Sequence, residues 1–160
     1  MSMTLNPVNE AAFQKAVQSL ETLNRAAVFH PTGTGKSCIA WKVVEAHPQT
    51  TFFWLVAGAQ RLALRQAELT RYNGGTLPGN VRFCDCEKLA AATPEQWVRL
   101  GEQKPGCVVL DCYHELSAVC WAQSVQKLLR MCPQAKVLGL GVPNGAPVCA
   151  AAQELFADCI

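Results

Sequence analysis

The sequence is poor in charged residues and lacks long apolar runs. Asp, Glu, Lys and Arg make up 16% of its 160 residues, and the net charge is +2. So small an excess of positive charge does not argue for binding to nucleic acid or to a membrane surface. No apolar run approaches the roughly 20 residues of a membrane helix. The first residues, MSMTLNPVNEAAF, lack the basic start and apolar segment of a signal peptide. We therefore expect a cytoplasmic protein without membrane contact.

The sequence also lacks a Cys-x-x-Cys pair, although it has nine cysteines. The closest pair, Cys84 and Cys86, has no cluster of further ligands beside it. A structural zinc site needs four ligands at workable spacing. We therefore expect reduced cysteines that pack as small buried side chains.

Half of the residues are hydrophobic, and short apolar runs alternate with segments of helical spacing. We expect strands at 26–29, 51–56, 81–84, 107–110 and 136–140. We expect helices at 10–23, 36–46, 59–72, 117–131 and 147–156, and one that starts at Thr93-Pro94-Glu95. The strands are apolar on both faces, which is typical of a parallel sheet covered by helices on both sides. Without a repeat, linker or low-complexity tract, residues 1–160 are predicted to form one α/β domain.

A phosphate-binding loop is predicted at residues 30–37, HPTGTGKS, between the first strand and the following helix. A glycine-rich turn at a helix N-terminus directs backbone N–H groups and the positive end of the helix dipole to one point. In this pattern the lysine reaches the β- and γ-phosphates and the serine hydroxyl binds Mg²⁺. The candidate ATP-binding residues are Thr32, Gly33, Thr34, Gly35, Lys36 and Ser37. The alternative is a chance glycine-rich turn with an exposed lysine.

A partner acid for this loop is predicted at Asp111, in CVVLDCYHEL at residues 107–116. The carboxylate follows an apolar strand and would hold Mg²⁺ through water, together with Ser37. The alternative is an aspartate that caps a helix after a strand. The loop upstream favours the magnesium role.

These two segments resemble motifs I and II of the superfamily 2 helicases, the DEAD/DEAH-box group. Motif I there commonly begins Ala-Pro-Thr-Gly, so His30 in place of a first glycine agrees with the group. Weaker similarities lie at 55–66, at 136–144 and at 6–17, where Asn9 lies near the group's adenine-contacting glutamine. The resemblance implies a three-layer RecA-like P-loop domain, the first of two, that binds ATP and Mg²⁺. It also implies nucleic acid, DNA or RNA, as a partner of a fuller assembly.

The resemblance assigns catalytic roles to Lys36 and Asp111, and to His114 as a link to motif III. Cys112 replaces the glutamate that orients the attacking water, and Glu115 is the nearest other carboxylate. Loss of a general base costs about 10²–10⁴ in rate. Residues 141–143 lack the hydroxyls of motif III. We also expect no second helicase domain within the chain, so that domain would have to belong to another chain.

We therefore expect the ATP-binding domain of a helicase-like, nucleic-acid-dependent ATPase, which is slow or inactive by itself. The alternative is a hydrolysis-impaired nucleotide-binding module or a truncated remnant. Arg61 and Arg65 lie four residues apart on the helix at 59–72, and we expect both on a solvated face. Contact with a nucleic-acid backbone is the alternative for these two arginines.

Overall fold

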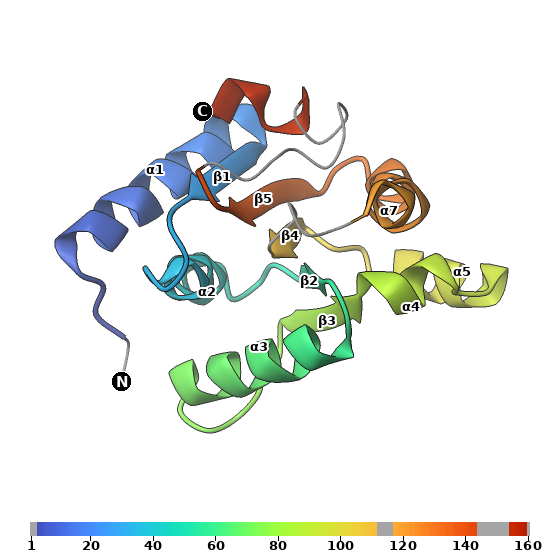
Figure 1. Ribbon diagram of the computed structural model, residues 1–160, viewed down its shortest axis with the longest axis horizontal. Helices are drawn as coiled ribbons and strands as arrows, with labels where there is room; N and C mark the ends of the chain where they lie inside the picture. Colours follow the sequence, from blue (N-terminus) through green and yellow to red (C-terminus); the bar gives the residue numbers. More distant parts are fainter. Residues whose placement is uncertain (1–2, 112–116, 144–153, 160) are drawn as a thin grey trace.

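The computed structural model describes residues 3–111, 117–143 and 154–159. Five parallel strands form one sheet in the order β1–β5–β4–β2–β3 (Figure 1). The strands are β1 Arg25–Phe29, β2 Phe52–Val56, β3 Val81–Asp85, β4 Cys107–Asp111 and β5 Lys136–Gly141. The parallel α/β class predicted from the sequence is confirmed, and each predicted strand is present within one residue at either end.

Helices occupy most of the remaining described residues. They are α1 Pro7–Leu23, α2 Lys36–Ala46, α3 Ala59–Tyr72, α4 Cys86–Ala90, α5 Pro94–Glu102, α6 Ala118–Cys120, the π-helix η2 Trp121–Gln126, α7 Lys127–Met131 and the 3₁₀ turn η3 Ala157–Cys159. α6, η2 and α7 follow one another without a break, so they form the single helix predicted there. The helix predicted at 147–156 lies largely outside the described residues.

Two helices differ from the prediction, and a side-chain cap accounts for each difference. α1 begins at Pro7, since Asn6 Oδ1 accepts a hydrogen bond of 2.8 Å from the Asn9 amide and proline suits the first helical position. The short helix α4 was not expected. It forms because the Asp85 carboxylate at the end of β3 accepts the Glu87 amide at 3.0 Å.

The sheet is packed on both faces, and alternate strand residues belong to different cores. On one face, Trp54 and Val109 pack beneath α1, α2 and α3. On the other face, Phe53 and Val108 pack with residues of α5, of the helix at 118–131 and of the C-terminal segment. Figure 1 shows this arrangement, with α2 and α3 on one side of the sheet and α5 and α7 on the other. The three layers leave the carboxyl ends of the strands as the place for a site.

At that edge, β5 lies between β1 and β4. β1 leads directly into the predicted phosphate loop, and β4 ends at Asp111. Adjacent strands are about 4.8 Å apart, so the two segments leave the sheet about 10 Å from each other. The His30 amide donates to the Gly141 carbonyl at 3.2 Å, which ties the start of the loop to the end of β5.

Among the described residues, no helix is both long enough and apolar enough to span a membrane.

Candidate functional site

The predicted phosphate loop has the backbone shape that its glycines suggest. Gly33 and Gly35 both have positive φ, 81° and 94°, which residues with a side chain rarely adopt. Gly35 is the N-terminal cap of α2, and Lys36 and Ser37 are its first two residues. The first amides of a helix have no partner within the helix, and its dipole places positive potential there. The turn therefore provides an anion-binding geometry at the end of β1.

Lys36 folds back over this loop. Its Nζ donates hydrogen bonds to the carbonyls of His30 at 2.8 Å and Pro31 at 3.1 Å. The Thr34 hydroxyl donates to the same Pro31 carbonyl at 2.6 Å. The ammonium group is thus held against the main chain of the loop. Thr32 lies in the exposed turn of the loop.

Asn9 connects α1 to the loop. It is 6% exposed, and its Nδ2 donates to the Thr34 carbonyl at 3.0 Å. A Cβ atom at Gly35 would lie only 2.8 Å from this Nδ2, so glycine is required there by contact as well as by φ. A hollow of about 610 Å³ opens between the start of α1 and the loop, lined by Asn9, His30, Gly33 and Thr34 among others.

The surroundings of His30 favour its neutral form. Burial lowers the pKa of its imidazole below the ordinary 6.5, and the nearby Lys36 charge lowers it further. A neutral imidazole next to the lysine leaves Lys36 as the cationic side chain at the start of the loop.

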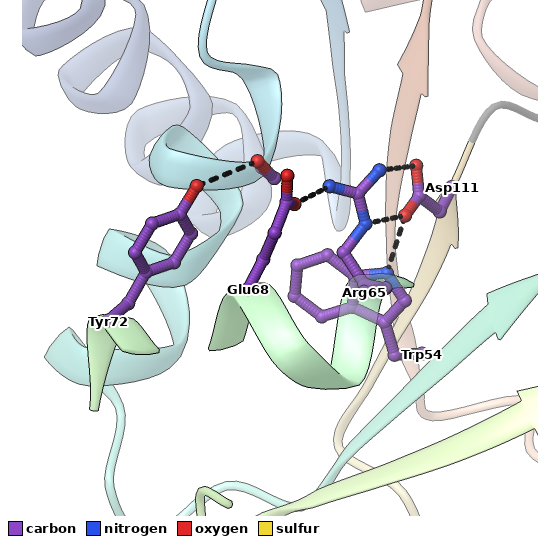
Figure 2. Close-up of polar contacts among 6 residues, drawn as sticks. Trp54, Arg65, Glu68, Tyr72 and Asp111 are labelled. Carbon is purple, nitrogen blue, oxygen red and sulfur yellow. Dashed lines mark hydrogen bonds and ion pairs between the residues drawn. The ribbon is translucent and has the colours of Figure 1, made fainter. Parts of the chain in front are cut away.

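The carboxylate of Asp111 is enclosed by donors from β2 and α3. Asp111 is 3% exposed. Trp54 Nε1 donates to its Oδ2 at 2.9 Å, Arg65 Nε donates to the same oxygen, and Arg65 Nη2 donates to Oδ1 at 3.1 Å (Figure 2). The prediction that Arg65 lies on a solvated face is therefore wrong, whereas Arg61 is exposed as expected.

Two further side chains of α3 continue this arrangement. Glu68 accepts from Arg65 Nη1, and the hydroxyls of Tyr72 and Ser37 lie 3.4 Å apart. We call Arg65, Glu68 and Tyr72 the polar row of α3. The sequence analysis missed Trp54, Glu68 and Tyr72. Spacing offered a signal, because Arg65 and Tyr72 fall on the same helical stripe as Leu62 and Leu69, whose side chains pack in the core.

These contacts do not fit the predicted magnesium site. Asp111 already accepts three hydrogen bonds, two of them from a cation, and a carboxylate offers about four acceptor positions. Ser37 fits a ligand role by its place at the start of α2, but its hydroxyl faces Tyr72. His114 and Glu115, and with them Cys112, lie outside the described residues. In the part of the chain that the structure describes, no three His, Cys, Asp or Glu side chains are grouped to hold a metal.

The comparison with solved structures identifies the fold. The chain is similar to a hypothetical ATP-dependent RNA helicase from Sulfolobus tokodaii, with a TM-score of 0.64 and 11% sequence identity. The similarity covers 98% of this chain and 55% of that one. The chain has a RecA-like fold. This confirms the predicted architecture, and the chain spans about half the length of the helicase structure it matches. No model of a known protein family and no curated protein matches the sequence.

Proposed function

We propose that the chain is a helicase-like nucleotide-binding module that binds ATP at residues 30–37. The observation that carries this proposal is the loop itself: two glycines at positive φ, followed by Lys36 and Ser37 at the first turn of α2. In this proposal the triphosphate displaces the Lys36 ammonium group from the carbonyls of His30 and Pro31. The ammonium group then binds phosphate oxygens, and the hollow beside Asn9 takes the nucleoside.

Turnover is proposed to be slow. Cys112 stands where the resemblance requires a glutamate, and a thiol is a poor replacement for a carboxylate base near neutral pH. Coupling to DNA or RNA, and a second RecA-like domain in another chain, stay predictions of the resemblance. We expect no strand separation by this chain alone. ATP-dependent unwinding of a fluorescent duplex by the purified chain would contradict that expectation.

The test is calorimetric titration of the purified chain with ATP, in buffer with Mg²⁺ and again in buffer with EDTA. We expect saturable binding to wild type in at least one buffer and its loss in Lys36→Ala. Lys42→Ala is the matched control, because Lys42 lies on the same helix and pairs with Glu45. Absence of binding to a folded wild-type chain in both buffers, or equal loss in both variants, would overturn the proposal.

A further inference from the structure

The polar row of α3 contacts both residues that the sequence assigns to magnesium. Arg65 binds Asp111, and Tyr72 lies 3.4 Å from Ser37. Arg65 and Tyr72 are two helical turns apart and therefore lie on one face of α3. Figure 2 shows this face directed toward the end of β4 on one side and the start of α2 on the other. Side chains of a single helix thus contact both predicted ligands.

The charge at the centre of this row is that of one guanidinium group between two carboxylates. Arg65 binds Asp111 through Nε and Nη2 and Glu68 through Nη1. The Arg65 side chain is 20% exposed and the Asp111 side chain 4% exposed. Arginine keeps its charge at every pH at which the protein is folded, and its planar donors match a carboxylate in two-point contact. Two carboxylates that converge on one positive charge form a cation site, and here the cation belongs to the protein.

Removal of Arg65 would raise the free energy of the folded state. Asp111 is buried, and a buried carboxylate without a partner is strongly unfavourable. Trp54 Nε1 donates a single neutral hydrogen bond, which does not compensate a full charge. A metal ion that bound both oxygens of Asp111 would have to compete with Arg65, which contacts both of them.

We propose that Arg65 is the resident cation of this site, and that the nucleotide binds at residues 30–37 without a divalent metal ion. This inference rests on the proposed nucleotide site and specifies its cation. Lys36, at the first turn of α2, and Arg65, at Asp111, then supply the positive side chains of the site. Magnesium is not needed to balance Asp111.

The first test compares the affinity of the wild-type chain for ATP in Mg²⁺ and in EDTA by calorimetry. We expect the two dissociation constants to differ by less than threefold. A threefold or larger weakening in EDTA would overturn the inference while it left the proposed nucleotide site intact.

The second test uses Arg65→Gln, with Arg65→Lys as the matched control that keeps the positive charge. We expect Mg²⁺ to tighten ATP binding at least tenfold in Arg65→Gln, because Asp111 and Glu68 then lack their cation. The cavity of about 120 Å³ that both carboxylates line, together with Arg61, gives an ion access to them. We expect less than a threefold effect in Arg65→Lys. A magnesium-insensitive Arg65→Gln that is folded by circular dichroism would overturn the inference.

A third test does not depend on nucleotide. Tb³⁺ bound at Asp111 would be excited through Trp54, whose indole nitrogen is 2.9 Å from the carboxylate. We expect no tryptophan-sensitised Tb³⁺ emission that depends on Asp111 in wild type. We expect emission in Arg65→Gln and its loss when Asp111→Asn is added. Wild-type emission that Asp111→Asn removes, or no emission from folded Arg65→Gln, would overturn the inference. If the wild-type chain binds no ATP, the Tb³⁺ test alone decides whether Arg65 is the resident cation. If Arg65→Gln does not fold, the wild-type ATP titrations and the wild-type Tb³⁺ emission decide it.

Discussion

The side-chain amide of Asn9 donates a hydrogen bond to the main-chain carbonyl of Thr34, 25 residues later, and so fixes the phosphate loop against α1. Asn9 is buried, and the donor nitrogen lies where a Cβ at Gly35 would collide with it. The position of the loop is therefore set by a helix that precedes β1, not only by the strand and helix that flank the loop.

Replacement of Asn9 by aspartate is expected to weaken ATP binding about tenfold or more. The substitution puts a carboxylate oxygen where an N–H group faced the Thr34 carbonyl, and it adds negative charge beside the proposed phosphate site. Asn9→Ala removes the bond without repulsion, so we expect a smaller loss and a cost of about 1 kcal/mol in the free energy of unfolding. Calorimetry and urea denaturation measure the two quantities.

Gln18→Glu, on the exposed face of the same helix, is the control for added charge. Wild-type affinity in Asn9→Asp would show that this contact does not position the loop for nucleotide.

The stability of the domain is expected to depend on Gly139 in β5. A Cβ atom at this glycine would lie 2.5 Å from the ring of Phe156, which is 1% exposed. Gly139→Ala should lower the free energy of unfolding by about 2 kcal/mol, within the range for overpacked cores. Phe156→Leu in the same chain should recover part of this loss, because the smaller side chain leaves room. Gly79→Ala, which meets no atom within 4 Å, is the control. Equal stability of the two alanine variants in urea denaturation would contradict the packing described here.

Two cysteines are expected to resist alkylation until the protein unfolds. Burial raises the pKa of Cys86 and of Cys107 to about 12. At pH 8.5 almost none of either thiol is the reactive thiolate, and neither side chain is accessible. Cys38, Cys120 and Cys159 are only partly buried and should react with iodoacetamide before Cys86 and Cys107 do. Mass spectrometry of peptides from native and urea-unfolded protein compares these rates, and early modification of Cys107 would contradict the prediction.

Acidification is expected to destabilise the protein partly through His30. Its pKa is lower in the folded state than the unfolded value near 6.5, because burial and then Lys36 disfavour the imidazolium form. The stabilising contribution is therefore complete above pH 6.5 and is lost as the pH falls toward the folded pKa. His30→Gln should show a smaller drop in Tm between pH 7.5 and pH 5.5 than wild type. An unchanged drop in His30→Gln would refute this role of His30.

The sequence predicted best those elements whose start and end residues lie next to them in the chain. α2 and α3 were predicted to the residue, since the glycines that precede them and the polar breaks that follow are adjacent in sequence. β2 and β4 were predicted because a fully buried strand is apolar on both faces. α4 was missed because its capping residue, Asp85, is also the last residue of β3.

The surroundings of Asp111 were the least predictable part of the site. Its partners are 46 and 57 residues earlier in the chain, on α3 and β2. The local pattern indicates which face of α3 is buried but not which distant residue that face contacts. The apolar stripe through Leu62 and Leu69 does contain Arg65, and an arginine within such a stripe indicates a buried acidic partner. The ion pair could have been suspected from that spacing, but Asp111 could not have been chosen from it.

The strand order also bears on how the chain folds. β1 is an edge strand of the sheet, and its strand partner is β5, so that Arg25 pairs with Val137. Closing the long loop between Arg25 and Val137 carries an entropic cost before the pairing of β1 with β5 adds any stability. Sheets built from such distant pairs form slowly. A nascent chain can form α2 early, but the strand that carries the phosphate loop gains its hydrogen-bonded neighbour only after β5 has been synthesised. The glycine-rich turn at residues 30–37 is thus encoded near the beginning of the chain, and the sheet edge that holds it is completed near the chain's end.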